Sequence, residues 1–556
     1  MEQGTVNRRQ PFRWGARART LTVDRAQTLI GISGLLAACA YLLVRLAPDV
    51  RGKPLHADEA VSGLVAARPF TELWSTVIDE RGGPPLHFLA AHLALALDPS
   101  ADALRWTSVA FALGTVIVCY DLGRRIAGPM AGATAALLAA SSTMLGQFGS
   151  FGRMYAAFAF TAALAADMFY RALEQRTTRA SVVAAMAAAL AAATHTYGVF
   201  ILLAEGAAGL ALWRGKPLRA GLPVALVGLL LIPVLLAYLR LSERFSVKVS
   251  EGPALTSPRA AARQLHVALG AVTGGRVLVV LFAVLAVCGV VLIARRQPAF
   301  LALWGAVAAP LLLYLLLSGA GAVELSPRHL IFVLPLWVAA VGAGFVLLAG
   351  RLPTAVQALL VAGLAVVAAQ SQMAAIGDPR GGSRFGAETG RPRALVVPAD
   401  WLQSHVRPTD VLFDYTTPFL AALDTSRDSV TVSPGPGRLL PRGLERVDYP
   451  VSAVVVPIPV VGAEVDRELL RNRLGDEAEI SLTPAWLLVR VPGPFESDEE
   501  LLLAILDTFG AAADAIPNPP DRVVTHLRTP FLATCRALAL AGSEPAECSS
   551  PPRARR

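Results

Sequence analysis

Long apolar runs constrain this chain more than any other feature of its sequence. Residues 26–46 contain one charged side chain, Arg45, and are long enough to cross a bilayer as a helix of about 20 residues. The mean hydropathy is +0.53 and 16% of the residues are charged, against roughly 25% in globular proteins. The sequence therefore predicts an α-helical polytopic membrane protein. Ten further runs give about eleven predicted spans in all: 104–122, 127–147, 154–172, 180–195, 198–213, 221–239, 276–294, 299–318, 328–349 and 353–372.

Basic residues fall in short clusters between these runs and predict the orientation of the chain. Residues 1–25 form a basic tail without the small-residue cleavage site of a signal peptide, so the first span is expected to stay as an anchor. By the positive-inside rule, this tail and the later clusters lie in the cytoplasm. The net charge of +9 is thus read as an orientation signal, and no nucleic-acid partner is predicted.

Residues 84–97 form a shorter apolar run that begins at Pro84 and Pro85. As a helix it would reach about 21 Å, less than a hydrocarbon core of ~30 Å. Counting it as a span would put every later basic cluster on the wrong side of the membrane, so a juxtamembrane or re-entrant helix is predicted. The C-terminal part of the chain then lies outside the cytoplasm.

The same topology gathers the polar sequences on the outer face. The first outer loop, 47–103, carries the adjacent acids Asp58 and Glu59, and the turns 150–155, 194–197 and 324–329 open on the same side. Polar residues within a membrane protein are costly and mark functional sites. An active site is therefore predicted at this face.

Residues 376–556 differ in composition and predict an extracytoplasmic soluble α/β domain after the transmembrane domain of 26–375. Its two cysteines, Cys535 and Cys548, form either a disulfide or two free thiols. The expected strands are Ala394–Val397, Val411–Tyr415, Ser429–Val432, Ala453–Val456 and Trp486–Val491, and the expected helices are Pro398–His405, Arg467–Leu474, Glu499–Ala513 and Pro530–Ala541.

The order of motifs along residues 20–372 resembles the GT-C glycosyltransferases. After the basic tail and first span come the acidic pair, the Pro-Pro-Leu helix, an R-x-x-S segment from Arg105 and a G-R-R turn. An R-M-Y turn at 153–155, a T-H-x-Y-G segment at 194–198 and a P-R-H segment at 327–329 follow. The resemblance is narrower to the bacterial branch related to protein O-mannosyltransferases and to the aminoarabinose transferases of lipid A.

The resemblance implies an inverting transfer from a polyprenyl-phosphate-linked sugar on the outer face of the membrane. A carboxylate accepts the proton of the acceptor hydroxyl while its oxygen attacks the anomeric carbon. The acidic position of the family falls on Asp58 or its neighbour Glu59; Asp58 is assigned as the base and Glu59 as an orienting or metal-contacting group. The alternative is that Asp58 only caps a juxtamembrane helix.

Cations are expected to balance the charge of the leaving phosphate. Arg153 and Arg328 are the first candidates and Arg105 and Arg81 the second, with an interfacial anchor as the alternative for each. Candidates for contacts with sugar or phosphate are Tyr155, Tyr197, His329 and His87.

Two features bear on a metal ion. Relatives often carry an acid two positions before the arginine of the R-M-Y turn, where this chain has Phe151, and Glu324 could replace it. His56 and His87 flank the acidic pair, so a divalent cation held by Asp58 and His56 is a further possibility.

The expected function is transfer of mannose or an arabinose-like sugar to a cell-envelope glycan, lipid or protein at the plasma membrane. The alternative from another class is a non-enzymatic lipid or glycan transporter, or a scaffold for envelope assembly. A transporter is expected to show intramembrane ionisable residues in paired, broken helices, and here Glu205 stands in one apolar run without a second copy.

Overall fold

The computed structural model describes most of the chain, with gaps. The described residues are 25–51, 57–67, 69–75, 77, 84–98, 100–212, 226–229, 231–239, 279–306, 327–377, 401–402, 404–413, 430–432, 444, 447–460 and 462–549. Arg81, His56, Glu324 and the predicted strand at 394–397 lie outside them.

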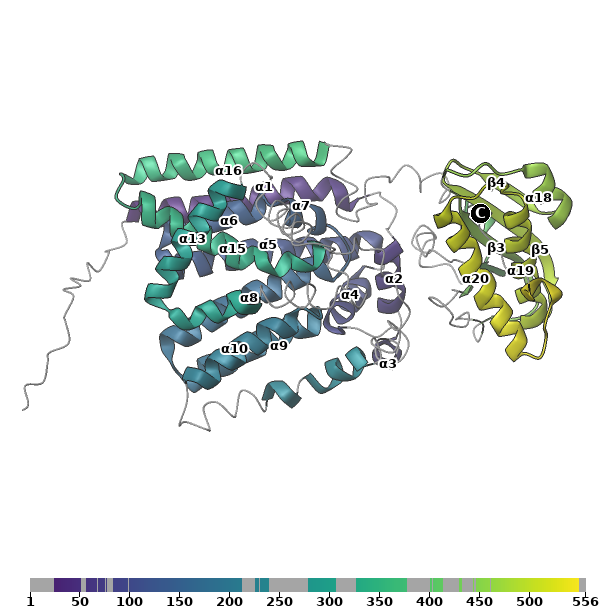
Figure 1. Cartoon of the computed structure of the whole chain (residues 1–556), viewed down its shortest axis with the longest axis horizontal. Helices are drawn as coiled ribbons and strands as arrows, with labels where there is room; N and C mark the ends of the chain where they lie inside the picture. The colour runs from purple at the N-terminus through teal and green to yellow at the C-terminus, as the bar shows by residue number, and fades with distance from the viewer. Residues whose placement is uncertain are drawn as a thin grey trace, which may run out of the picture.

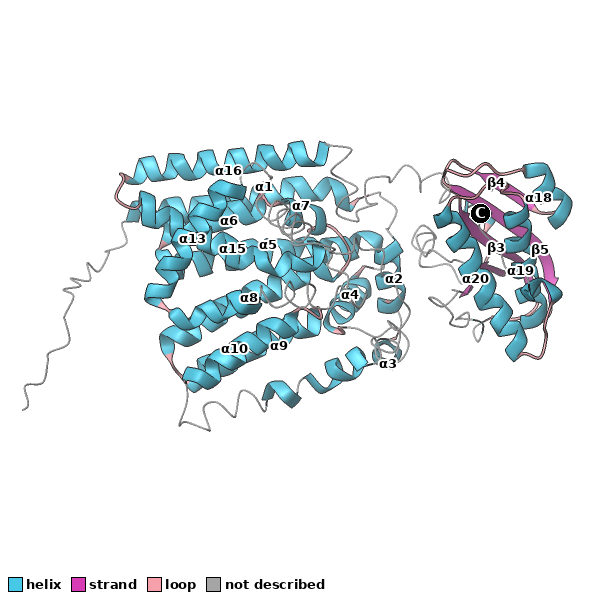
Figure 2. Cartoon of the chain, viewed as in Figure 1, coloured by secondary structure: helices cyan, strands magenta, loops and turns pink. Residues whose placement is uncertain are grey.

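The described helices between residues 25 and 377 form a bundle in which they run side by side (Figures 1 and 2). The α-helices are α1 (Arg25–Val50), α2 (Ala57–Ala66), α3 (Phe70–Ser75), α4 (Leu86–Leu97), α5 (Ala101–Ala127), α6 (Pro129–Ala140), α7 (Thr143–Phe148), α8 (Met154–Gln175), α9 (Thr178–Thr194), α10 (Gly198–Leu212), α13 (Val279–Arg296), α15 (Val333–Ala349) and α16 (Thr354–Gly377). The 3-10 helix η2 (Pro298–Leu301) follows α13, and the 3-10 helix η4 (Pro327–Phe332) comes directly before α15. Alanine and other apolar side chains from most of these helices fill one continuous core.

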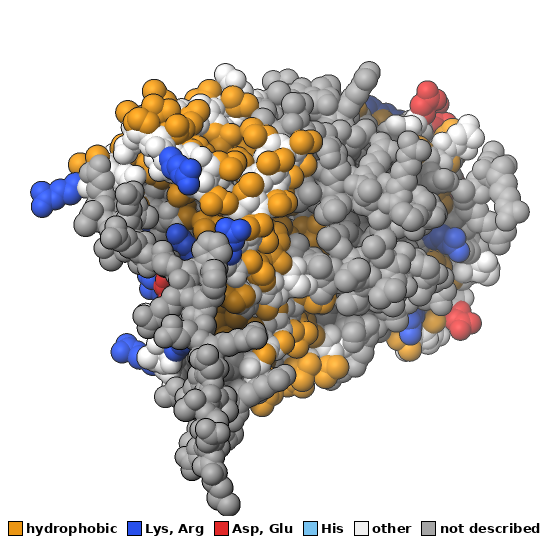
Figure 3. All heavy atoms as spheres, turned by 60° about the vertical axis from the view of Figure 1, so that its left-hand side comes forward, with side chains coloured by type: hydrophobic (Ala, Val, Ile, Leu, Met, Phe, Trp, Pro, Cys, Tyr) orange, Lys and Arg blue, Asp and Glu red, His pale blue; other side chains and the backbone are white. Residues whose placement is uncertain are grey.

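Five of the described helices are long and apolar enough to cross a membrane: Arg25–Val50, Asp102–Ala127, Met154–Gln175, Val279–Arg296 and Arg328–Ala349. Shorter apolar helices, such as Thr178–Thr194 and Gly198–Leu212, coincide with other predicted spans. Large apolar side chains are exposed on several of these helices, and Figure 3 shows a face on which they dominate, with arginines among them. The protein is a membrane protein; the count of eleven crossings stays a prediction.

Two details of the bundle bear on the sequence predictions. The run 84–97 contains the short helix α4, as expected, and Pro85 stands at its N-cap. Residues 127–147, predicted as one span, contain two helices, α6 and α7, instead of one continuous helix. The break comes at Ser142, whose Oγ accepts a hydrogen bond from Leu145 N at 3.1 Å and so caps a new helix.

The arginines predicted as cytoplasmic orientation signals also join two helices. Arg125 Nε on α5 lies 3.2 Å from Asp167 Oδ1 on α8, and 3.0 Å from Asp121 Oδ2 one turn earlier on its own helix. Arg171 Nε lies 2.9 Å from the other oxygen of Asp167. Because Asp167 is 1% exposed, this network fixes the two helices at the end away from the acidic pair.

Glycines allow helices α13 and α15 to touch through their backbones. A Cβ added at Gly289 would lie 1.8 Å from Ala340 O, and one added at Gly344 would lie 1.8 Å from Leu285 O. Small residues of this kind permit close helix packing. In membranes this packing matters because the hydrophobic effect does not drive helices together there.

Gly289→Ala is expected to destabilise the bundle by about 2–3 kcal/mol or more, since a helix backbone must move to admit the methyl group. The measurement is the thermal unfolding of the protein in lipid discs. Gly363→Ala on α16 is the matched control, because nothing lies within 4 Å of the added Cβ. An unchanged melting temperature for Gly289→Ala would contradict the close packing of α13 and α15.

The C-terminal part contains a five-stranded sheet in the order β2-β1-β3-β5-β4. β1 pairs in parallel with β2 and β3, and β5 pairs antiparallel with β3 and β4. The strands are β1 (Asp410–Phe413), β2 (Val430–Val432), β3 (Val451–Pro459), β4 (Glu479–Leu482) and β5 (Trp486–Phe495), and the helices are α18 (Arg467–Leu474), α19 (Asp498–Asp514), α20 (Asp521–Leu540) and the 3-10 helix η8 (Ala546–Ser549).

The α/β character of this part agrees with the sequence prediction, with two differences. Strand β4 was missed because its polar, half-buried residues lack an apolar run, and α20 begins nine residues before the predicted helix at Pro530, counted from Asp521 to Pro530. Helices α19 and α20 pack on one face of the sheet (Figure 2). A buried ion pair, Arg490 Nε to Asp410 Oδ2 at 3.1 Å, joins β5 to β1.

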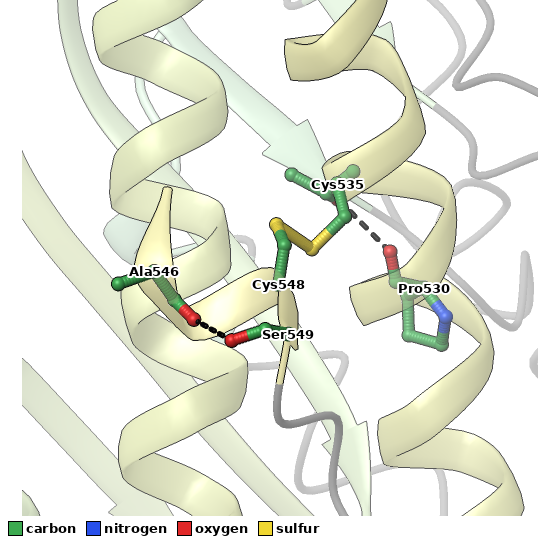
Figure 4. The surroundings of a disulfide bond; sticks show 6 residues. Pro530, Cys535, Ala546, Cys548 and Ser549 are labelled. Atoms are coloured by element: carbon green, nitrogen blue, oxygen red, sulfur yellow. Dashed lines mark hydrogen bonds between the residues drawn. A yellow bond between two sulfur atoms is a disulfide. The ribbon is translucent and has the colours of Figure 1, made fainter. Parts of the chain in front are cut away.

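Cys535 on α20 and Cys548 in η8 form a disulfide (Figure 4). The bond ties η8 to α20 across 13 residues of sequence. Of the two alternatives left open by the sequence, the structure has the disulfide.

Candidate active site

Glu59, on the first turns of α2, is the centre of a buried polar network. The residue is 2% exposed and both carboxylate oxygens accept hydrogen bonds. Oε1 accepts hydrogen bonds from Gly152 N at 2.7 Å and from Arg105 Nε at 3.1 Å, and Oε2 accepts one from Arg105 Nη2 at 2.9 Å. Glu59 therefore holds the R-M-Y turn and helix α5 against α2.

Arg105 completes this network from α5. Its guanidinium forms a bidentate pair with Glu59, and Nη1 also donates to Val50 O at 3.3 Å, at the end of α1. Bidentate arginine–carboxylate pairs fix orientation as well as distance. Arg105 was predicted as a second-choice phosphate ligand, and the structure places it as the joint between α1, α2 and α5, with 5% of its surface exposed.

Asp58 lies one residue before Glu59 in α2, and its side chain is outside the described part of the structure. Ser62, also on α2, accepts at Oγ a hydrogen bond from Arg153 Nη1 at 3.3 Å, so α2 contacts the R-M-Y turn through this residue as well.

The R-M-Y turn is held by backbone contacts. Ser108 Oγ on α5 donates to Phe151 O at 2.6 Å, and Glu59 accepts from the next residue, Gly152. The ring of Phe151 is buried and stacks against Tyr155, with centroids 6.2 Å apart. At the position where relatives often have an acid, this chain thus has an apolar packing residue.

Aromatic and imidazole rings from three separate segments, at residues 155, 195–197 and 329, lie next to one another. His195 and His329 have ring centroids 5.3 Å apart, Tyr155 lies 6.3 Å from each of them, and Tyr197 lies 5.6 Å from His329. Arg328 lies over the Tyr155 ring, with Cζ 5.8 Å from its centroid. The structure therefore brings together four predicted residues: Tyr155, Tyr197, His329 and Arg328. These four and His195 are here called the imidazole cluster.

His195 was missing from the predicted site residues, although the T-H-x-Y-G segment that contains it was recognised. It is 3% exposed and its ring stacks on Phe158, with centroids 4.6 Å apart. Tyr197 N donates a hydrogen bond to His195 Nδ1 at 3.1 Å, which leaves the proton of the neutral ring on Nε2. His195 thus offers a donor inside the cluster. Its electrostatic interactions are with His329, Arg153 and Arg328.

His87, at the start of α4, is 7% exposed, and within the described residues its Nε2 has no hydrogen-bond partner. Burial and the charge of Arg153 lower the pKa of His87 to about 3, so the ring is neutral at pH 7. His92, on the same helix, places Nδ1 2.8 Å from Ala66 O and ties α4 to the end of α2. The predicted candidates His87 and Arg153 are thus linked by the effect of the arginine charge on the imidazole.

Among the described residues, no group of three or more His, Cys, Asp or Glu side chains could hold a metal ion. His56 and the side chain of Asp58, which were proposed as metal ligands, lie outside those residues. Glu59, the other acid of the pair, already has three hydrogen bonds from Arg105 and Gly152.

Comparison with known proteins agrees with this arrangement. Residues 82–239 match the family model of dolichyl-phosphate-mannose-protein mannosyltransferases, a range that includes α4, Arg105, the R-M-Y turn and His195. The fold resembles ArnT from Cupriavidus metallidurans in the apo state, with a TM-score of 0.55, 14% identity, and coverage of 84% of this chain and 99% of that chain. The family match thus covers one part of the bundle, and the similarity to ArnT shows a shared fold over most of both chains.

Two further structures are similar to this chain. ArnT from Cupriavidus metallidurans bound to undecaprenyl phosphate has a TM-score of 0.52 and 15% identity, over 84% of this chain and 99% of that chain. The oligosaccharyltransferase of Archaeoglobus fulgidus in the apo form has a TM-score of 0.45 and 12% identity, over 76% of this chain and 69% of that chain. A search of curated protein sequences finds no match.

Proposed function

We propose that this protein is a GT-C glycosyltransferase that transfers a sugar from a polyprenyl-phosphate donor to a hydroxyl of a cell-envelope acceptor on the outer face of the plasma membrane. The observation that carries the proposal is the meeting of α2, the R-M-Y turn and the imidazole cluster, which come from distant parts of the sequence. The ArnT structure with undecaprenyl phosphate supports the donor class, since its fold is similar over most of both chains.

Asp58 acts as the base in this proposal. It takes the proton of the acceptor hydroxyl while that oxygen forms a bond to the anomeric carbon, and the bond from that carbon to the phosphate oxygen breaks. The electron pair of the broken bond leaves with polyprenyl phosphate, which becomes more negatively charged. The acceptor attacks from the face opposite to the leaving group, so the configuration at the anomeric carbon inverts.

Arg153 and Arg328 stabilise the leaving phosphate. Both act electrostatically on His195, and the hydrogen bond from Tyr197 N to His195 Nδ1 leaves His195 Nε2–H as a further donor. Donors and cations that are already in place stabilise developing negative charge without reorganisation. Glu59 and Arg105 contribute by position: they fix the helix that carries Asp58 against the turn that carries Arg153.

The topology and location remain part of the proposal. The N-terminus is cytoplasmic and residues 376–556 are extracytoplasmic, where they contribute to acceptor recognition. The disulfide between Cys535 and Cys548 supports this side, because disulfides persist in oxidising compartments.

We expect Cys535 and Cys548 to be oxidised in protein isolated from cells under alkylating conditions. Mass spectrometry of the peptides before and after reduction measures this. Cys119, buried in α5, is a control that remains a free thiol. Complete alkylation of Cys535 and Cys548 without reduction would place them in the cytoplasm and contradict the proposed orientation.

Transport of a lipid or glycan is the second candidate, and Glu205 is the observation that favours it. This acid lies in α10 with 6% exposure, and its Oε1 has no hydrogen-bond partner in the described residues. Ionisable side chains inside membrane helices often mark transport pathways.

Donor turnover tests the proposal against this alternative. Purified protein in sealed lipid vesicles is given polyprenyl-phosphate mannose and arabinose, with envelope glycans as acceptors. The release of polyprenyl phosphate and the side of the membrane that holds the intact donor are both measured. Release that depends on the protein and the acceptor supports the transferase. Movement of intact donor across the membrane without release would support transport and refute the transferase.

A further inference from the structure

Two stacked rings lie on the face of the C-terminal sheet away from α19 and α20. On that face Leu412 and Leu488 pack in a small core with Leu402. Trp401 and His405 belong to the same short segment as Leu402, and both are partly exposed. Their rings are nearly parallel, with centroids 4.3 Å apart and an interplanar angle of 12°. The segment therefore presents apolar ring surface to solvent.

The backbone carbonyl of Trp401 decides which nitrogen of His405 carries the proton. Nδ1 lies 2.7 Å from Trp401 O. A carbonyl oxygen can only accept a hydrogen bond, so Nδ1 is the donor. In the neutral ring, Nε2 is then a hydrogen-bond acceptor without a proton.

Glu479, on the edge strand β4, faces this nitrogen with a second acceptor. Its Oε1 accepts a hydrogen bond from Arg490 Nη1 at 2.9 Å, and Arg490 is held in turn by Asp410. Its Oε2 lies 3.9 Å from His405 Nε2, too far for a direct hydrogen bond. Neither atom has a hydrogen-bond partner in the described part of the chain. The His405 and Glu479 side chains are 35% and 43% exposed, so a ligand from solvent can reach both acceptors.

Two neighbouring acceptors favour a ligand that donates twice. Adjacent hydroxyls of a sugar can donate one hydrogen bond to each acceptor, whereas the carboxylate repels phosphate and other anions. The stacked rings offer apolar area for the C–H face of a sugar ring, and ligand sites combine such rings with a few placed polar groups. A zinc ion is disfavoured because it takes at least three protein ligands, and the described residues contain no such group of three.

We propose that Trp401, His405 and Glu479 form a binding subsite for a neutral, hydroxylated glycan, and that this glycan is the acceptor of the transferase. Identifying the glycan as the acceptor rests on the proposed function, while binding itself is measured without donor. Arg490 and Asp410 are positioning residues, since they hold the Glu479 carboxylate in place.

The first test is titration calorimetry of the full-length protein in lipid discs without donor. The probes are α-linked mannotetraose, α-linked arabinotetraose and a tetrapeptide that contains lysine. We expect at least one oligosaccharide to bind and Glu479→Gln to weaken that binding by about tenfold or more, because Arg490 retains the amide oxygen and an NH₂ donor replaces Oε2. Glu477→Gln, in the exposed turn before β4, is the matched control and should bind like the wild type. Binding of neither oligosaccharide, or of the peptide alone, overturns the inference.

The second test separates a ligand contact from a structural one. His405→Phe keeps a ring beside Trp401 and removes Nε2. Well below the melting temperature, we expect it to weaken oligosaccharide binding by about tenfold and to raise the KM for the acceptor, with the KM for the donor unchanged. If His405→Phe and Glu479→Gln lower only the melting temperature and bind the oligosaccharide like the wild type, the two residues merely join the segment to β4 and the inference is overturned.

The two proposals fail in different ways. Donor turnover by a wild-type protein that binds neither oligosaccharide overturns the subsite and leaves the proposed function standing. Oligosaccharide binding that depends on Glu479, without turnover of any donor, overturns the proposed function and supports the subsite.

Discussion

Asp58→Asn is expected to reduce sugar transfer by roughly 10²–10⁴-fold, because an amide cannot accept the proton of the attacking hydroxyl. Donor affinity should change little, since the phosphate is assigned to Arg153 and Arg328. The measurements are the release of polyprenyl phosphate at saturating donor and the binding of the donor to the variant. Retention of full activity would remove Asp58 as the base.

The matched control for this substitution is Asp98→Asn. Asp98 is exposed at the end of α4 and outside the proposed site, so the same chemical change there should leave transfer unaltered. If Asp58 only caps α2, its replacement by asparagine, which is an equally good capping residue, should also leave transfer unaltered. The pair of variants therefore separates the base from the cap.

Arg105→Met is expected to destabilise the protein by about 3–5 kcal/mol, since it leaves the Glu59 carboxylate buried without its cation. The contact is nearly inaccessible to water, with side-chain exposures of 6% and 3% for the two partners. Thermal unfolding in lipid discs measures the loss. If Arg105→Met unfolded at the same temperature as Asp98→Asn within error, the structural role of the pair would be contradicted.

The double variant Glu59→Leu and Arg105→Met extends this test. Replacing both partners of a buried ion pair by apolar residues is often nearly neutral for stability, so much of the lost stability should return. Transfer should not return, because Gly152 N loses its acceptor and the turn that carries Arg153 is released from α2. Full transfer in a stable double variant would show that the pair does not position the site.

The combined effect of the Glu59 and Arg105 substitutions also tests the prediction that Arg105 binds the donor phosphate. As a phosphate ligand, Arg105 would be needed for binding of sugar-free polyprenyl phosphate even in the stable double variant. As a joint between α1, α2 and α5, its loss should lower turnover more than that binding. A double-mutant cycle on both quantities separates the two roles.

Much of the fold follows directly from the sequence. Apolar runs of sufficient length must form helices in lipid, because no water is present there to satisfy the backbone, so the positions of α1, α5, α8 and α13 could be predicted. The run 84–97 was predicted as a short helix from its length, its two prolines and the later basic clusters, and the structure has the 12-residue helix α4 there. The order of short motifs indicated a resemblance to GT-C glycosyltransferases, and the fold is similar to that of ArnT.

The sequence also indicated which segments form the site, through polar turns on one side of the predicted membrane topology. It identified Tyr155, Tyr197, His329 and Arg328, which the structure brings together. It missed His195 because a single histidine at a helix end gives no signal until its neighbours in space are known.

Only the tertiary structure decided which acid of the adjacent pair is already engaged, and which arginine engages it. Glu59 contacts Arg105, 46 residues away in sequence, and Gly152, 93 residues away. Local pattern cannot specify such contacts, because they depend on how α2, α5 and the R-M-Y turn pack together. Sequence thus determined the helices and their motifs, while packing between distant segments joined Glu59 to Arg105 and to the R-M-Y turn.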